Sequence, residues 1–190
     1  MTKSILLIGV GGQGTILISR ILSAGFAGMG YDVKMSEIHG MSQRGGSVTT
    51  MIRYGEDVHS PNFGETEADV IISFEKSEAV RALPMLKKGG TLITDSHEIL
   101  SVPVLTGASG YPHDALEQLK ASVENTVVIE AFDAAQKLGN SRCQNIVLLG
   151  KLVRTMGLQD KADWKAIIAR NVPPKTVEIN LRAYDTGFDM

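Results

Sequence analysis

Two glycine-rich stretches near the start of the 190-residue chain carry the residue types that could bind an anion or a partner. The first covers residues 9–14 and reads Gly-Val-Gly-Gly-Gln-Gly, which fits the spacing G-x-G-x-x-G. Glycines in such a turn let backbone N–H groups approach an anion, and a following helix adds partial positive charge there. The pattern therefore indicates a phosphate cradle between a strand and a helix. Its predicted site residues are Gly9, Gly11, Gly12, Gln13 and Gly14.

The second stretch, residues 39–47, is dense in side chains that donate hydrogen bonds. An ordinary connecting loop can also be polar and glycine-rich, but this concentration favours a functional role. Open α/β sheets bind ligands in the loops at the carboxyl ends of their strands. Arg44 is the strongest candidate, because a guanidinium can grip a carboxylate or phosphate with two parallel bonds. The predicted site residues here are His39, Gly40, Ser42, Gln43, Arg44, Gly45, Gly46 and Ser47.

Glu37 precedes this second stretch, at the end of an expected strand over residues 31–38. A dinucleotide-binding unit places the acid that holds a ribose hydroxyl at about this position. The plainer interpretation is a solvated carboxylate at a strand end. With the glycine turn, Glu37 supports a stand-alone NAD- or flavin-dependent oxidoreductase as one hypothesis. A nucleotide-sensing or scaffold protein of the same fold is another.

Cysteine content limits the chemistry of the chain itself. Cys143 is the only cysteine, so neither a disulfide framework nor a zinc or iron–sulfur site can be built from thiolates. It precedes an apolar stretch, which favours a buried structural thiol over a nucleophile. The trio Asp95, Ser96 and His97 resembles part of a hydrolase constellation. Nothing around it forms a nucleophile elbow, so we do not expect a catalytic triad.

The composition is that of an ordinary α/β protein. Hydrophobic residues make up 43% of the chain, charged residues make up 21%, and the net charge is −2. No stretch concentrates lysine and arginine, which argues against a nucleic-acid partner. No apolar run approaches the roughly 20 residues of a membrane helix, and the N-terminus lacks the pattern of a signal peptide. We therefore expect a cytoplasmic protein without a membrane partner.

Hydrophobic periodicity predicts one α/β domain over residues 1–190. The expected fold has three layers, a mostly parallel, mixed sheet, and a Rossmann-like first strand, glycine turn and helix. The segment 48–54 follows its neighbour with no room for a crossover helix, which predicts an antiparallel strand. Residues 87–90 are expected to form a turn and residues 101–111 to be irregular. Strands are expected over residues 4–10, 31–38, 48–54, 68–74, 91–94 and 126–130, and helices over 15–29, 75–86, 112–122, 132–138, 141–156, 163–171 and after Pro173 and Pro174.

The two glycine-rich stretches together resemble a known family. IGVGGQGTILISRIL followed by KMSEIHGMSQRGGSV is similar to the gamma subunit or gamma domain of 2-oxoacid:ferredoxin oxidoreductases, and in particular to the small (beta) subunits of the indolepyruvate branch. Downstream segments are compatible with it over nearly the whole chain: ADVIISFEKSEAVRALPMLKKGG, NIVLLGKL and PPKTVEINLRAYDTG.

This resemblance implies a division of labour. Enzymes of the family oxidatively decarboxylate a 2-oxoacid on thiamine diphosphate, pass electrons through iron–sulfur clusters to ferredoxin, and release an acyl-coenzyme A. The chain has one cysteine and no Gly-Asp-Gly motif. The resemblance therefore places thiamine diphosphate, magnesium and the clusters on a large partner subunit. This chain alone would bind no cofactor and be inactive, while coenzyme A and ferredoxin would be met through the complex.

The resemblance also changes the interpretation of the glycine turn. In this family the turn need not hold a nicotinamide or flavin. It could pack against partner backbone, which we favour for Gly12 and Gly14, or line the route of the coenzyme A phosphates. For Gln13 and Arg44 we favour contact with a ligand or with the partner subunit. The implied substrate is indolepyruvate or another aryl pyruvate.

Overall fold

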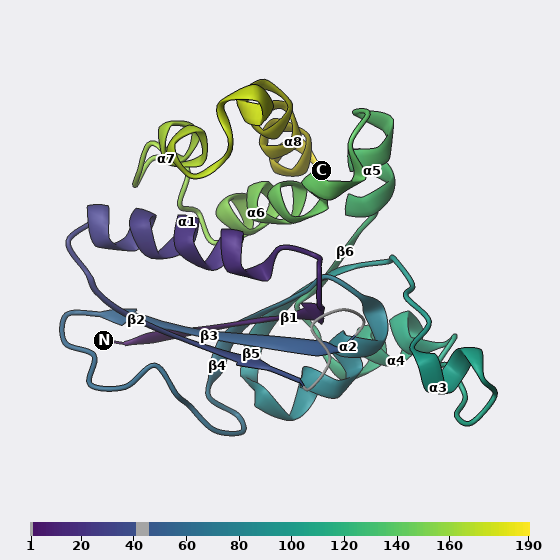
Figure 1. Cartoon of the computed structure of the whole chain (residues 1–190). Helices are drawn as coiled ribbons and strands as arrows, with labels where there is room; N and C mark the ends of the chain where they lie inside the picture. Colours follow the sequence, from purple (N-terminus) through teal and green to yellow (C-terminus); the bar gives the residue numbers. More distant parts are fainter. Residues whose placement is uncertain (1, 41–45) are drawn as a thin grey trace.

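The computed structural model describes residues 2–40 and 46–190 and shows a six-stranded sheet between two layers of helices (Figure 1). The strand order is β2-β3-β1-β4-β5-β6. β1, β4, β5 and β6 run parallel, whereas β3 is antiparallel to both of its neighbours, β1 and β2. The predicted mixed, mostly parallel sheet and the predicted antiparallel strand are both confirmed. The strands are β1 (Lys3–Val10), β2 (Asp32–His39), β3 (Ser47–Gly55), β4 (Ala68–Ser73), β5 (Leu86–Asp95) and β6 (Thr126–Ile129).

Helices cover the two faces of the sheet unequally. Figure 1 shows one layer above the sheet that holds α1 and the four C-terminal helices α5 to α8, and a smaller group on the other side. The first layer consists of α1 (Thr15–Gly28), α5 (Ala131–Lys137), α6 (Gln144–Thr155), α7 (Trp164–Asn171) and α8 (Val177–Asp189). The smaller group consists of α2 (Lys76–Ala82), α3 (Val102–Leu105) and α4 (Ala115–Ser122). Short 3-10 turns η1 (Leu83–Met85), η2 (Ser141–Cys143) and η3 (Pro174–Thr176) complete the described elements.

Alternation along β1 divides the core in two, because successive strand residues point to opposite faces. Ile5 and Leu7 belong to the larger core under α1 and α6, and Leu6 and Ile8 belong to the smaller core on the face of α2. All four are buried, which confirms a first strand covered on both faces.

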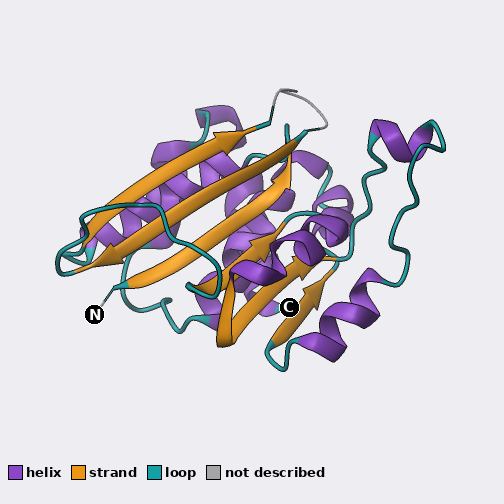
Figure 2. Ribbon diagram, turned by 90° about the horizontal axis from the view of Figure 1, so that it is seen from below, coloured by secondary structure: helices purple, strands orange, loops and turns teal. Residues whose placement is uncertain are grey.

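The face of the sheet that carries α2 is covered unevenly. Figure 2, which views the sheet from this face, shows no helix over β2 and β3.

Several predicted boundaries were wrong. β5 begins at Leu86 and includes the predicted turn, because the lysine- and glycine-rich segment bulges: Ala68 pairs with Leu86, but Val70 pairs with Thr91. The segment expected to be irregular contains α3. The helix expected from residue 112 begins at Ala115, and the one expected from residue 141 begins as a 3-10 turn and becomes α6 at Gln144.

Candidate functional site at the carboxyl edge of the sheet

At the carboxyl ends of the adjacent strands β1 and β4, the connections leave the sheet towards opposite faces, and we name this place the switch point. β1 leads into α1 on one face, and the adjacent β4 leads into α2 on the other (Figure 1). Open α/β sheets bind their ligands at such a switch point. The first glycine turn follows β1, and the second stretch connects the carboxyl end of β2 to the start of β3, at the same edge. The fold therefore brings the two predicted regions together.

A backbone hydrogen bond joins the two stretches directly: Gly11 N donates to Gly46 O at 2.8 Å. The second stretch is also closed at its base, where Gly40 N donates to Ser47 O at 3.2 Å. His39 is the last residue of β2. The predicted residues Ser42, Gln43, Arg44 and Gly45 lie outside the described residues.

The glycine turn needs glycine at two positions because of backbone conformation, and at one of them because of packing as well. Gly12 and Gly14 have φ angles of +106° and +83°, which L-residues with a side chain rarely adopt. Around Gly12 a Cβ would meet open space, whereas at Gly14 it would lie 2.3 Å from Nδ2 of Asn145. Asn145 donates from this Nδ2 to Gly14 O at 3.3 Å. The first turn of α6 thus packs directly on the glycine turn.

Gln13 has partners for both ends of its side-chain amide. Its Oε1 accepts from Val10 N at 2.7 Å, and its Nε2 donates to Phe74 O at 2.8 Å and to Oε1 of Gln144 at 3.4 Å. Gln144 in turn donates to Phe74 O and to Oδ2 of Asp95, at 2.8 and 2.7 Å. The chain's own amides therefore fill the α1 side of the switch point, where a dinucleotide-binding unit would hold a pyrophosphate.

Asp95 ends this network beneath the helices. It is fully buried and accepts from the backbone N–H groups of His97, Ala131 and Phe132 as well as from Gln144. Burial raises the pKa of Asp95, and the hydrogen bond from Gln144 opposes this shift. The imidazole of His97 stacks on Phe132 with ring centroids 3.8 Å apart. Asp95 thus joins the end of β5 to the start of α5, and this geometry is not that of a catalytic triad.

On the α2 side of the switch point, two buried carboxylates lie at the start of α2: Glu75 at its N-cap and Glu78 in its first turn. Glu75 caps the helix by accepting from Glu78 N at 3.0 Å, and it also accepts from Ser77 Oγ and from the hydroxyl of Tyr111. Burial, followed by the hydrogen bond to Glu75, raises the pKa of Tyr111 well above its usual range. Glu78 accepts from Ser47 Oγ at 2.6 Å and from Arg81 at 2.8 Å.

A cavity of about 300 Å³ opens between these groups, and we name it the switch-point cavity. Val10 and Ser47 form one wall, α2 forms another, and the segment between β5 and α4 closes it. Its lining residues are Val10, Ser47, Ser77, Glu78, Val80, Arg81, Ile99, Ser101, Val104, Ser109, Gly110, Tyr111 and Pro112. Sequence reasoning missed Glu75, Glu78 and Tyr111. The position of Glu75, directly after a buried strand, was the available signal.

Glu37 lies farther from the glycine turn than a ribose-binding acid would. Its strand, β2, is separated from β1 by β3. Glu37 faces α1, where Ser19 Oγ donates to its Oε1 at 3.4 Å. In a dinucleotide-binding unit the acid follows the strand next to β1. This topology weakens the ribose interpretation.

Comparison with known proteins identifies the family. The family described as "Pyruvate ferredoxin/flavodoxin oxidoreductase" matches residues 4–190. The chain belongs to this family. The resemblance seen in the glycine-rich stretches is thereby confirmed.

Curated relatives match this chain over nearly its whole length. The chain is 41% identical to indolepyruvate oxidoreductase subunit IorB of Thermococcus kodakarensis and 42% identical to that of Pyrococcus horikoshii, each over 97% of this chain and 93% of the relative. Among solved structures, the gamma subunit of a keto/oxoacid ferredoxin oxidoreductase from Geobacter sulfurreducens matches with a TM-score of 0.72 at 22% identity, covering 98% of this chain and 96% of that one. This likeness shows the fold.

Cys143 of this family member is buried, as the sequence predicted, and burial raises the pKa of its thiol. An iron–sulfur cluster needs several thiolate ligands, so this donor set does not fit a resident cluster. Among residues 2–40 and 46–190, no helix is long and apolar enough to cross a membrane.

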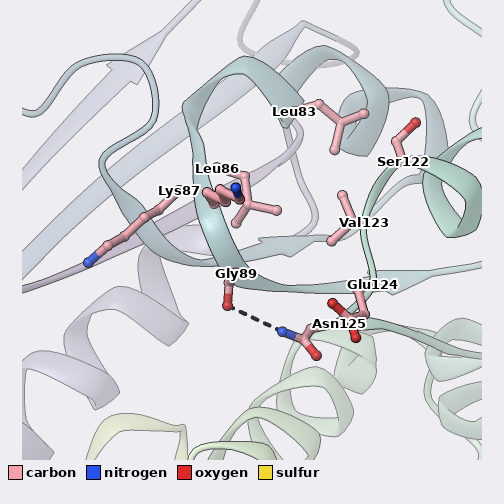
Figure 3. Close-up of a pocket in the computed structure, with 10 residues that line it drawn as sticks. Leu83, Leu86, Lys87, Gly89, Ser122, Val123, Glu124 and Asn125 are labelled. Carbon is pink, nitrogen blue, oxygen red and sulfur yellow. Dashed lines mark hydrogen bonds between the residues drawn. The ribbon is translucent and has the colours of Figure 1, made fainter.

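A second cavity, similar in volume to the switch-point cavity, lies at the opposite edge of the sheet, where the parallel strands begin (Figure 3). It measures about 340 Å³ and sits where β5 begins, beside the β5 bulge and the residues that precede β6. Asn125 Nδ2 donates there to Gly89 O at 3.2 Å. None of the predicted site residues that the structure describes lines it, so it is separate from the described parts of the two glycine-rich stretches.

Proposed function

We propose that the chain is the small subunit of an indolepyruvate:ferredoxin oxidoreductase. The enzyme would oxidatively decarboxylate indolepyruvate or a related aryl pyruvate, reduce ferredoxin and release an acyl-coenzyme A. The observation that carries this proposal is the identity of 41–42%, over nearly the full length of both chains, to subunits named for indolepyruvate oxidoreductase. Relatives named for 2-oxoglutarate synthase are more distant, at 24–26% identity.

Within such an enzyme the thiamine diphosphate, magnesium and clusters would belong to a large partner subunit. The single buried cysteine supports this assignment, because it supplies one thiolate where a cluster needs several. The contribution of this chain would be to complete the active-site enclosure and to line part of the coenzyme A route. Among the described residues of the second stretch, Ser47 lines the switch-point cavity, and Gly46 before it accepts from Gly11 N.

The carboxyl edge would be the docking surface. Four of the seven large hydrophobic side chains that the described part of the chain exposes lie at this edge: Ile16, Ile38, Leu100 and Leu105. Exposed apolar groups that gather on one surface are typical of interaction sites. Because Gln13 and Asn145 fill the inner side of the glycine turn, its open side at Gly12 is the part left to face a partner.

The alternative is a stand-alone oxidoreductase that binds NAD or flavin at the glycine turn. The positive φ angles of Gly12 and Gly14 are the observation that supports it. Contact of Asn145 with Gly14 and the remote position of Glu37 argue against it. A scaffold protein without chemistry is a third hypothesis, which the family assignment disfavours.

Co-production with the thiamine-bearing subunit tests the proposal. The purified complex should reduce ferredoxin when given indolepyruvate and coenzyme A, and each chain alone should not. Pyruvate and 2-oxoglutarate serve as competing substrates under the same conditions. Full activity of the large subunit alone would contradict the proposal, and stoichiometric flavin or NAD on this chain would favour the alternative.

A further inference from the structure

Glu78 joins two parts of the carboxyl edge that are distant in sequence. Its side chain is only 8% exposed, and its two oxygens serve different donors. Oε1 pairs with Arg81, one turn along the same helix, at 2.8 Å. Oε2 accepts from Ser47 Oγ, the first residue of β3, at 2.6 Å. The second contact is therefore the one that crosses from α2 to the sheet.

The cost of burying this carboxylate makes the arrangement informative. Removing a carboxylate from water is unfavourable unless a cation or hydrogen-bond donors replace the water. Arg81 offsets part of this cost from within α2, and its own side chain is 64% exposed. An apolar residue at position 78 would cover the same cavity wall without that cost, but it could not accept the hydrogen bond from the hydroxyl of Ser47.

Ser47 is the point at which the second glycine-rich stretch returns to the sheet. Its carbonyl accepts from Gly40 N, and Gly46 before it accepts from Gly11 N. In the sheet Ser47 pairs with Val10, the last residue of β1. The hydrogen bond from Ser47 Oγ to Glu78 adds a side-chain link from α2 to the place where both stretches meet, at the wall of the switch-point cavity.

We infer that Glu78 is a positioning residue that, through Ser47, holds the start of β3 against the switch-point cavity and so shapes the surface that the complex uses during turnover. This inference rests on the proposed function. Glu78 acts through Ser47 rather than on a substrate, and Arg81 keeps the carboxylate in place. The consequence is that Glu78 and Ser47 act as a unit.

Steady-state kinetics of the co-produced complex test the inference with Ser47→Ala, Ser47→Thr, Glu78→Gln and the double variant Ser47→Ala/Glu78→Gln. Hydrogen bonds to charged groups are the stronger ones, so we expect Ser47→Ala to lower kcat/KM about tenfold, carried mainly by the KM for coenzyme A. The double variant should be no worse than the more damaging single variant, because coupled residues are not additive. Ser47→Thr keeps the hydroxyl and should recover activity to within about twofold of wild type.

Asp185→Asn, which removes the exposed Lys165–Asp185 ion pair, is the matched control and should have the kcat/KM of wild type.

Additive losses, or a Ser47→Thr variant as impaired as Ser47→Ala, would overturn the inference. Losses that follow only the amount of complex formed would overturn it too. Amide exchange of the isolated full-length chain separates this inference from the proposed function. Ser47→Ala should speed exchange at Gly40 and at residues 46–48, whatever reaction the complex catalyses. If the wild-type complex does not turn over indolepyruvate, unchanged exchange in Ser47→Ala refutes the positioning role and faster exchange upholds it.

Discussion

Gln13 donates its side-chain amide to the carbonyl oxygen of Phe74 at 2.8 Å, which ties the glycine turn after β1 to the end of β4. The same side chain accepts from Val10 N at 2.7 Å. A residue expected to reach outward to a ligand thus bridges two strand ends within its own chain. Whether it also contacts a partner stays a prediction.

Replacing Gln13 with alanine should therefore destabilise the folded chain. The change removes a hydrogen bond from each end of the amide: Val10 N loses the acceptor Oε1, and Phe74 O keeps only the donor Gln144. We therefore expect a loss of about 1–3 kcal/mol in the free energy of unfolding. Urea unfolding measures it. Gln118→Ala, at a helix position where the amide only pairs with Asp114 at the surface, is the control and should change stability by less than about 0.5 kcal/mol. Equal stability of wild type and Gln13→Ala would show that the hydrogen bonds of Gln13 to Val10 and Phe74 do not stabilise the fold.

Alanine at Gly12 and Gly14 should separate backbone strain from packing. Both positions have positive φ, which costs alanine about 1–2 kcal/mol. Gly14→Ala also forces its Cβ onto Asn145, so it should lose at least about 1 kcal/mol more than Gly12→Ala. In a double-mutant cycle Asn145→Ala should recover part of the Gly14→Ala loss. Equal losses at the two glycines would contradict the packing interpretation.

The sequence predicted the parts of this fold that depend on local patterns. The buried first strand, the glycine turn and the antiparallel strand after the second stretch follow from periodicity and from the lack of room for a crossover. Contacts such as Asn145 on Gly14 join residues 131 apart, and no local pattern reports them. The β5 bulge was missed because Gly89 and Gly90 read as a turn, whereas pairing with β4 draws them into the strand.

The candidate site was likewise predicted only where a local sequence pattern marks it. The two glycine-rich stretches were recognised because the first fits the spacing G-x-G-x-x-G and the second concentrates hydrogen-bond donors within a few residues. Glu78 and Tyr111 were not, because each gains its role only from a partner in another element, Ser47 for one and Glu75 for the other.

Tyr111→Phe should loosen the segment between β5 and α4. It removes the hydroxyl that donates to the buried Glu75, at an expected cost of about 1–3 kcal/mol near pH 8. The raised pKa of Tyr111 means that this stabilisation is complete below about pH 10 and declines as the pH rises further, since the unfolded chain loses the proton first. The difference in unfolding free energy between wild type and Tyr111→Phe should therefore shrink between pH 9 and pH 11. A difference that stays constant over this range would contradict the assignment.

Charged substitutions at the carboxyl edge should weaken assembly without unfolding the chain. Ile38 and Leu105 are 54% and 66% exposed, so glutamate at either position should change stability by less than about 0.5 kcal/mol. If these side chains are buried against the large subunit, each change should weaken the complex about tenfold or more in a binding titration. Met190→Glu, at an exposed apolar residue of the C-terminus, is the control and should bind as wild type does. Wild-type affinity of both edge variants would place the interface elsewhere.

Amide hydrogen exchange, compared between the free chain and its active complex with the thiamine-bearing subunit, tests the docking account most directly. We predict strong new protection at residues 36–40, 46–50 and 99–111, which border the carboxyl edge and the switch-point cavity. Residues 86–91 and 122–125, which border the hollow at the opposite edge, should exchange as they do in the free chain. Protection confined to that opposite edge, in a complex that produces acyl-coenzyme A, would contradict the account.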